Sequence, residues 1–317
     1  MKYSRLEAKD YARAHLRGIW AAPLNPMHSD FSIDEEGLRA NIRHWIDDLD
    51  IDGMCACSKL GECGSLSLAE LKRVAEIIIE ECGGDTGTAV TCMDQNPDTV
   101  LELARHAQDA GADFIVIHTP VLPLVVERCE TVRVYFEYLC SKLDIGVIVW
   151  SHPDAGYVLS PESCVELARI PNIVGFKYSG PRPMYAALTR MAGENFVVTC
   201  GSETEWLQNI TELGWQLYFS NSWPYLMQTR NDRRIREYTD FAMRGEVEKA
   251  REIHGSLEQV RQALRSSRPS GKPHAHQKYW LELLGQTGGS VRRPMLELTD
   301  AEKANVLAAF QGCGLQL

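Results

Sequence analysis

The feature that most constrains the fold is a repeated alternation of short apolar runs with longer amphipathic segments. Eight apolar runs lie between residues 18 and 222, and several are apolar at consecutive positions, as in parallel strands covered on both faces. Eight strand–helix units predict a (β/α)8 TIM barrel. A doubly wound sheet is the alternative, but the count reaches eight and no dinucleotide-binding glycine loop is present. The predicted strands lie in residues 18–24, 53–58, 87–92, 113–119, 145–151, 172–179, 195–202 and 215–222, with helical spacing in 36–49, 67–82, 97–110, 129–142, 161–169 and 203–213.

The chain continues beyond the eighth unit. Residues 231–267 and 275–311 are predicted to be helical, and the Gly-, Pro- and Ser-rich stretch SSRPSGKP separates them. Thr299 follows a proline stop and has Glu302 three residues later, the pattern of a helix N-terminus. We therefore expect a barrel with a short N-terminal leader over residues 1–230 and a C-terminal helical extension over residues 231–317, packed on the barrel.

Composition excludes several classes of function. The net charge of −10 argues against general binding to nucleic acid or anionic membranes. The start of the chain is polar, and no run reaches the ~18 apolar residues of a membrane span. None of the ten cysteines forms a CxxC motif, and several lie in apolar runs (Cys55, Cys57, Cys92, Cys164 and Cys200). These cysteines are predicted to be small buried hydrophobic residues in a reducing, cytoplasmic setting.

Metal and nucleotide motifs are also missing. His274 and His276 form an HAH motif, but no cysteine or carboxylate cluster accompanies them, so no metal site is predicted. The chain contains no GxxxxGK[ST], GxGxxG or GxSxG motif.

Lys177 stands in NIVGFKYSG, a run that otherwise resembles a buried strand. In a barrel the carboxyl ends of the strands build the active site, and Lys177 is placed at such an end. A lysine desolvated beside Phe176 and Trp150 has a lowered pKa and can attack a carbonyl group as a neutral amine. The alternative is a structural lysine that caps the strand or pairs with a carboxylate such as Glu62. Its position alone leaves both interpretations open.

Five motifs occur in an order that resembles a known family: GECGSLSLAE, IVIHTP, VIVWSHP, IVGFKYS and KYWLELLGQTGGSVRRPMLELTDAEK. Together they resemble the dihydrodipicolinate synthase / N-acetylneuraminate lyase family of class I aldolases over nearly the whole chain. The resemblance implies a barrel in which Lys177 forms an imine with a 2-oxo acid, usually pyruvate. No metal or organic cofactor is then needed, because the imine is the electron sink. It also implies small-molecule partners, a 2-oxo acid and an aldehyde, and a homo-oligomer built as a dimer of dimers.

Further site residues are expected at the ends of other strands. The predicted substrate-binding residues are Ser58, Lys59, Leu60, Gly61, Glu62, Gly201, Ser220 and Asn221. The family usually has two hydroxyl residues before its Gly-Glu pair, where this chain has Lys59 and Leu60. Lys59 can hold a substrate carboxylate and lower the pKa of Lys177 by charge. The alternative is that Lys59 points outward and pairs with Glu62 or Glu70.

The residues that relay protons in the family are replaced in this chain. Trp150 stands where the family has a tyrosine, and an indole N–H donates a hydrogen bond but cannot accept a proton. His152 is the predicted acid–base residue, with a loop histidine making one hydrogen bond as the alternative. Val121 and Leu122 replace a tyrosine pair of the synthases, and Ala155 stands in place of their arginine. The resemblance therefore does not extend to dihydrodipicolinate synthase activity.

The sequence thus predicts a class I lyase that makes or breaks a C–C bond next to a 2-oxo acid. The cysteine of GECGSL and the leader RLEAKDYARAHLRGIWAAPLNP favour the hydratase-aldolase branch, which cleaves aromatic benzylidene-pyruvates. An apolar wall for an aromatic ring is expected from Trp150, Trp206, Phe219, Trp223 and Tyr225, with ordinary core packing as the alternative. A 2-oxo-3-deoxy sugar acid dehydratase or aldolase and a non-catalytic metabolite-binding protein are the rival functions.

Overall fold

Eight parallel strands form the centre of the protein in a computed structural model that describes residues 2–84, 86–122 and 128–317. Each strand from β1 to β6 pairs with the next one along the chain, and β1 also pairs with β8, so that β7 and β8 are the two ends of the strand order. Between β7 and β8 the Thr199 hydroxyl donates to the carbonyl of Leu217 (2.9 Å) and accepts from the amide of Phe219 (3.1 Å). The (β/α)8 barrel predicted from the sequence is confirmed. The strands are β1 Gly18–Ala21, β2 Gly53–Ala56, β3 Gly87–Cys92, β4 Phe114–His118, β5 Gly146–Ser151, β6 Ile173–Tyr178, β7 Val197–Thr199 and β8 Leu217–Phe219.

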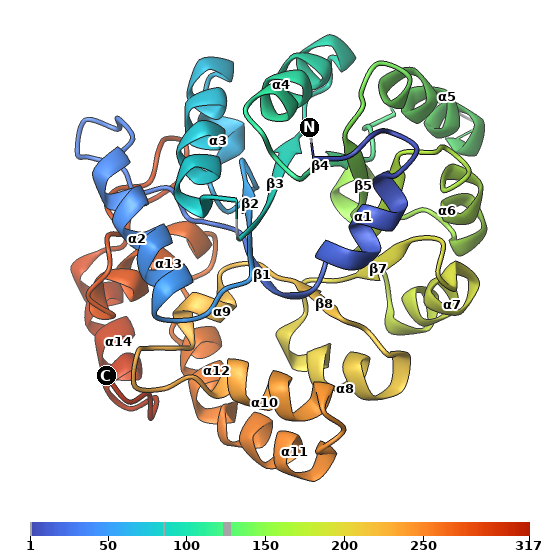
Figure 1. Ribbon diagram of the computed structural model, residues 1–317. Helices are drawn as coiled ribbons and strands as arrows, with labels where there is room; N and C mark the ends of the chain where they lie inside the picture. Colours follow the sequence, from blue (N-terminus) through green and yellow to red (C-terminus); the bar gives the residue numbers. More distant parts are fainter. Residues whose placement is uncertain (1, 85, 123–127) are drawn as a thin grey trace.

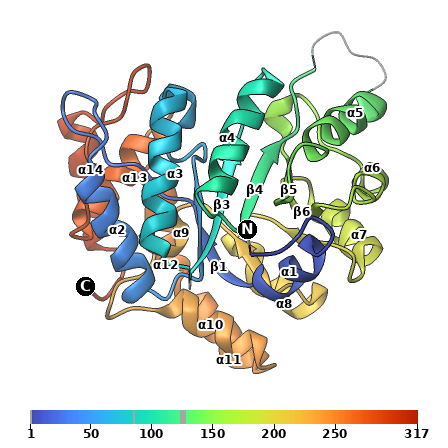
Figure 2. The same cartoon turned by 45° about the horizontal axis from the view of Figure 1, so that its top comes forward.

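An outer layer of helices surrounds the strands (Figures 1 and 2). Their apolar faces cover the outside of the sheet, which is why the strands are apolar on both faces. Cys57, Cys92, Cys164 and Cys200 lie in this core, and Cys55 lies inside the barrel, so their predicted burial is confirmed. The helices are α2 Glu35–Asp47, α3 Leu68–Cys82, α4 Pro97–Asp109, α5 Arg128–Cys140, α6 Pro161–Leu167, α7 Arg182–Ala192 and α8 Glu203–Leu213. In the described part of the chain, no helix has both the length and the apolar character needed to cross a membrane.

Helix α1 (Ala8–His15), which the sequence did not predict, closes one end of the barrel. Ala8 and Ala12 pack against the barrel-interior cluster that contains Phe114. Ahead of the helix, the Tyr3 hydroxyl donates to the carbonyl of Asp113 (2.5 Å) and accepts from the amide of Gly146 (2.8 Å). These contacts lie at the amino ends of β4 and β5, so the carboxyl ends of the strands face away from α1.

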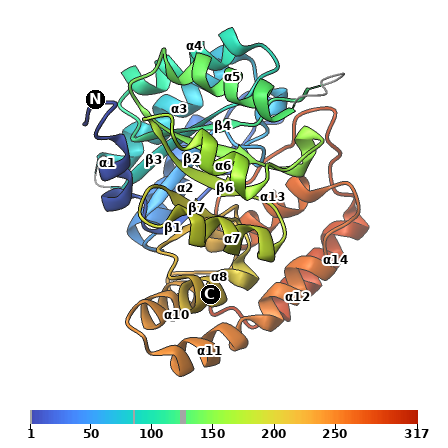
Figure 3. The ribbon, with the colours of Figure 1, turned by 90° about the vertical axis from the view of Figure 1, so that its right-hand side faces the viewer.

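The predicted C-terminal helical extension is present as a group of helices on one side of the barrel (Figure 3). The capping box of Thr299 and Glu302 at the start of α14 is confirmed. The continuous helical region predicted over 275–311 is wrong in its middle, because residues 284–299 are not helical. Gly285 and Gly289 have positive φ there, which a helix does not allow. The helices of the extension are α10 Arg234–Met243, α11 Val247–Ser256, α12 Glu258–Ser266, α13 Pro273–Leu283 and α14 Asp300–Gln311, and the short helix α9 Trp223–Leu226 precedes them.

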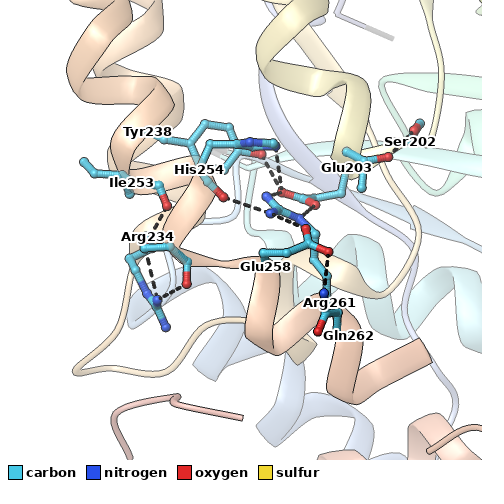
Figure 4. A network of polar contacts seen from close by, with 11 residues as sticks. Ser202, Glu203, Arg234, Tyr238, Ile253, His254, Glu258, Arg261 and Gln262 are labelled. Carbon is cyan, nitrogen blue, oxygen red and sulfur yellow. Dashed lines mark hydrogen bonds and ion pairs between the residues drawn. The ribbon is translucent and has the colours of Figure 1, made fainter. Parts of the chain in front are cut away.

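A buried polar network fixes these helices to the barrel (Figure 4). Glu203, at the start of α8, accepts from two guanidinium nitrogens of Arg261 on α12, at 2.5 and 2.9 Å. The hydroxyl of Tyr238 on α10 donates to the same carboxylate at 2.9 Å. All three side chains are buried, so the ion pair is shielded from water on both sides. The network joins the helix that follows β7 to the C-terminal extension.

Candidate active site

Lys177 lies near the carboxyl end of β6 and is 8% exposed. Its Nζ atom lies 4.9 Å from the ring centroid of Trp150 and 4.7 Å from that of Phe219. Among the residues described, no carboxylate forms an ion pair with Lys177. The alternative pairing with Glu62 is wrong, because Glu62 pairs with Lys278 on α13. Lys177 is therefore a buried amine between two aromatic rings.

Burial lowers the pKa of the Lys177 ammonium below its usual value, since the charged form loses its hydration. The thiols of Cys55 and Cys200 oppose this shift, while the positive charge of Lys59 adds to it. The environment thus favours the neutral amine, which is the nucleophilic form.

Trp150 forms the wall beside Lys177, because the two residues are register partners on β5 and β6. The indole Nε1–H lies 3.4 Å from the hydroxyl of Ser179, to which it donates. The side chain is buried and faces the lysine, as the sequence predicted for this position. Its contacts give the site an apolar surface and a donor, but no proton acceptor.

The loop after β2 brings the predicted residues Ser58 to Glu62 to the same end of the barrel. Glu62 has a positive φ of 58° and forms an ion pair with Lys278 at 2.5 Å, with both side chains fully buried. Its second oxygen accepts from the amide of Arg292 at 2.8 Å. Burial lowers the pKa of Lys278, although the Glu62 carboxylate opposes the shift. Both oxygens of Glu62 are thus occupied by the C-terminal part of the chain.

Other contacts hold the same loop in place. The amide of Gly61 donates to the hydroxyl of Ser58 (3.4 Å), and the carbonyl of Gly61 accepts from the side-chain amide of Asn25 (2.6 Å). The His274 ring lies 2.9 Å from the carbonyl of Lys59. Leu60 is half-buried and packs against the barrel interior. The conformation of this loop is therefore held by hydrogen bonds and depends in part on its contacts with α13.

Lys59 lies at the centre of a polar group that the sequence did not predict. Its ammonium forms an ion pair with Asp154 and lies 3.2 Å from Nε2 of His118 and 4.2 Å from the Trp150 ring centroid. Its predicted alternative partners are wrong, since Glu62 pairs with Lys278 and Glu70 pairs with Arg292. The Lys59 ammonium instead lies beside the Trp150 ring, which Lys177 also contacts.

Asp154 joins two histidines to this group. One carboxylate oxygen, Oδ1, lies 2.9 Å from Nε2 of His118 and 2.6 Å from Nδ1 of His152. We call Lys59, His118, His152 and Asp154 the Asp154 cluster. Burial and the charge of Lys59 lower the pKa of both histidines, which favours their neutral forms. Burial alone raises the pKa of Asp154, but hydrogen bonds from Lys59 and His152 outweigh it and lower that pKa below its usual range.

The donor atoms of His118, His152 and Asp154 lie within 4.8 Å of one another, as in a metal site. The cation that this group already holds is the ammonium of Lys59, which bonds to the carboxylate. We therefore assign no metal to it. Sequence reasoning missed Asp154, although its place two residues after His152 was a usable signal.

The remaining predicted residues lie at the ends of β7 and β8. Gly201 follows β7, and Ser220 and Asn221 follow β8. The amide of Ser220 donates to the carbonyl of Trp20 (2.8 Å), and the side-chain oxygen of Asn221 accepts from the amide of Trp223 (2.9 Å). The structure places these three residues at the same end of the barrel as Lys177, and their substrate-binding roles stay predictions.

The predicted aromatic wall is wrong for two of its members. Trp206 stacks on Tyr218 and donates to the hydroxyl of Thr239 (3.0 Å), and Tyr225 stacks on Trp45 at 4.0 Å between ring centroids. Both fill the core because large aromatic rings bury much apolar area between helix and sheet. Trp150 and Phe219 are the aromatic residues that contact Lys177.

A buried lysine without a carboxylate partner among the described residues thus lies at the carboxyl ends of the strands of a (β/α)8 barrel, where enzymes of this fold have their active sites. The chain matches the model of the dihydrodipicolinate synthetase family over residues 15–312, and it belongs to that family. It is 30% identical over 294 residues to a 4-hydroxy-tetrahydrodipicolinate synthase of Methanospirillum hungatei, covering 89% of this chain and 94% of the relative. It is 27% identical over 320 residues to a probable 5-dehydro-4-deoxyglucarate dehydratase of Bradyrhizobium sp., covering 96% and 95%.

Solved structures agree with the fold. N-acetylneuraminate lyase from Fusobacterium nucleatum superposes with a TM-score of 0.83 at 22% identity, covering 94% of this chain and 98% of that one. Dihydrodipicolinate synthase from Aquifex aeolicus gives 0.81 at 21% identity, covering 93% and 97%.

Proposed function

We propose that the protein is an imine-forming lyase that acts on a 2-oxo acid such as pyruvate, with Lys177 as the nucleophile. The observation that carries the proposal is the buried amine of Lys177, held without a carboxylate partner and with a lowered pKa. The amine attacks the keto carbon, the carbinolamine loses one water, and a C=N bond joins Nζ to the substrate. The protonated imine then accepts the electron pair of the bond that breaks next to it.

The other predicted residues have supporting roles in this proposal. The ammonium of Lys59 and the amides of the Ser58–Glu62 loop hold the substrate carboxylate, and Trp150 and Phe219 flank the imine. Gly201, Ser220 and Asn221 line the opposite side of the mouth. His152 is the proton-transfer group, since Trp150 only donates.

A hydroxylated 2-oxo acid suits the site better than an aromatic one. The Asp154 cluster places four polar side chains at the mouth, while two of the expected aromatic residues lie in the core. The relative named as a probable 5-dehydro-4-deoxyglucarate dehydratase supports dehydration as the second candidate reaction. Trp150 and Ala155, at the positions of the relay tyrosine and the arginine, argue against dihydrodipicolinate synthase activity.

A panel of 2-oxo acids with borohydride tests the proposal. Each acid is mixed with the protein, reduced, and examined by intact mass. We expect a covalent adduct with pyruvate, and a larger yield or faster conversion with the natural 2-oxo acid. A metabolite-binding protein without catalysis forms no adduct with any member of the panel, and that result overturns the proposal.

The rate of adduct formation is expected to rise with pH through the lowered pKa of Lys177 and to level off below the ~10.4 of a free lysine, because only the neutral amine attacks. Trapping at short times across pH measures it. Lys59→Met removes a nearby positive charge, so its midpoint is expected at higher pH. A midpoint at the free-lysine value in the wild-type protein contradicts the proposed role of burial.

Lys59→Met is also expected to weaken 2-oxo acid binding by about 1.5–3 kcal/mol, the range for a hydrogen bond to a charged group. Pyruvate concentration series with trapping give the apparent dissociation constant. Lys72→Met, which breaks an exposed ion pair with Glu102 on the outer helices, is the matched control. Unchanged binding in Lys59→Met shows that its ammonium serves Asp154 alone.

A further inference from the structure

We infer that Asp154 is a positioning residue that fixes the tautomer of His152, so that His152 Nε2 is the base of the site. The inference rests on the proposed imine at Lys177 and deepens it. Once the imine exists, the next step removes a proton from carbon 3 of the bound 2-oxo acid. His152 Nε2 takes this proton, the C–H electron pair becomes a C=C bond, and the C=N electron pair returns to Nζ of Lys177. The product is a neutral enamine and an imidazolium.

The need for such a base follows from the neighbours of Lys177. Trp150 has no proton-accepting atom, and Lys177 itself is consumed in the imine. The ammonium of Lys59 is paired with Asp154. Two members of the Asp154 cluster lie beside the Trp150 ring: the Lys59 ammonium is 4.2 Å and the His152 ring centroid 5.5 Å from the Trp150 ring centroid. His152 is therefore an imidazole beside the same aromatic ring that Lys177 contacts.

The two histidines differ in which nitrogen is open. Nδ1 of His118 lies 2.7 Å from the carbonyl of Thr119, and its Nε2 faces both the Lys59 ammonium (3.2 Å) and Oδ1 of Asp154 (2.9 Å). Both nitrogens of His118 are occupied. Nδ1 of His152 lies 2.6 Å from the Asp154 carboxylate, a distance that requires a hydrogen between them, and this outweighs the 3.3 Å contact with the Asp154 amide. Within the described residues, Nε2 of His152 has no hydrogen-bond partner.

The charge of Asp154 makes the arrangement stable. Its other oxygen, Oδ2, binds the Lys59 ammonium, so the carboxylate stays ionised while Oδ1 faces the imidazoles. The charged and titratable groups that face His152 are Asp154 on its own loop, Lys59 from the β2 loop and His118 from β4. An ionised carboxylate on Nδ1 both selects the tautomer and stabilises the imidazolium that forms, as in serine hydrolases.

Deuterium exchange into pyruvate tests the inference without the natural substrate. The protein is incubated with pyruvate in D₂O, and loss of the methyl signal is followed by proton NMR, because each enamine that forms and returns takes up deuterium. Borohydride trapping is run on the same samples. We expect Asp154→Asn to form the adduct but to exchange roughly 10²–10⁴-fold more slowly, because the amide N–H donates to Nδ1 and moves the hydrogen to Nε2.

Four further variants separate positioning from structure. His152→Gln is expected to match Asp154→Asn, and the double variant to be no slower than either. Asp154→Glu is expected to recover part of the exchange rate. Lys72→Met, which changes only an ion pair on the outer helices, is the control and is expected to retain the wild-type exchange rate. The wild-type exchange rate is expected to rise with pH through a pKa below ~6.5, the value of a free histidine, since burial lowers the pKa of His152.

The outcomes distinguish this inference from the proposed function. If Asp154→Asn forms the adduct and exchanges at the wild-type rate, the base is a bound water or the substrate carboxylate, and the inference is wrong. If Lys59→Met loses exchange as fully as Asp154→Asn at saturating pyruvate, Asp154 acts through Lys59 and the inference is also wrong. If the wild-type protein forms no adduct, the proposed function fails first and the inference falls with it.

Discussion

Replacement of Lys177 by methionine is expected to abolish both the 2-oxo acid adduct and all turnover. Among the residues that the structure describes, no other amine is placed to form the imine, because Lys59 is bound to Asp154 and Lys278 is bound to Glu62. The fold is expected to survive, since methionine fills a similar volume and needs no hydration in a buried position. Intact mass after reduction and the urea midpoint measure the two effects.

Lys249→Met is the matched control, because Lys249 is an exposed lysine on α11 that pairs with Glu246, three residues earlier in the chain. The control is expected to keep the adduct and the activity. A reduced adduct that persists in Lys177→Met, or a large fall in its urea midpoint, contradicts the assignment of Lys177 as a nucleophile held in an apolar site.

Arg261→Ala is expected to destabilise the protein by about 3–5 kcal/mol, the range for removing one of the two charged partners of a buried ion pair. The change leaves Glu203 buried without its guanidinium partner and keeps a single hydrogen bond from Tyr238. Denaturant unfolding, followed by a probe of tertiary structure, measures the loss.

Two variants check this reason for the loss. Arg251→Ala breaks an exposed pair with Glu248 and is expected to change stability by less than about 0.5 kcal/mol. The double variant Glu203→Gln with Arg261→Met removes both charges and is expected to recover part of the stability. If Arg261→Ala unfolds like the wild-type protein, the network of Figure 4 does not fix the extension to the barrel.

The sequence predicted the barrel and Lys177 because both depend on local patterns. Strand and helix periodicity gave the eight units, and the carboxyl ends of parallel strands converge on one site whatever the loops do. Lys177 and Trp150 therefore lie at the carboxyl ends of their strands, as their positions in the predicted strands indicated.

Contacts between distant segments account for the parts that sequence reasoning missed. Lys59, His118 and Asp154 come from the ends of β2, β4 and β5, and only the closed barrel brings them together. Glu62 finds its partner on α13, more than two hundred residues later. Trp206 and Tyr225 were expected in the site because they are aromatic. Aromatic residues also fill the core between helices and sheet, so residue type alone does not distinguish a core position from the wall of a binding site.

The most direct test of the central claim is to reduce the wild-type protein with borohydride in the presence of pyruvate and to map the modified residue by peptide mass. The account predicts one adduct per chain, located on Lys177. An adduct on Lys59, or no adduct under conditions in which pyruvate binds, contradicts it.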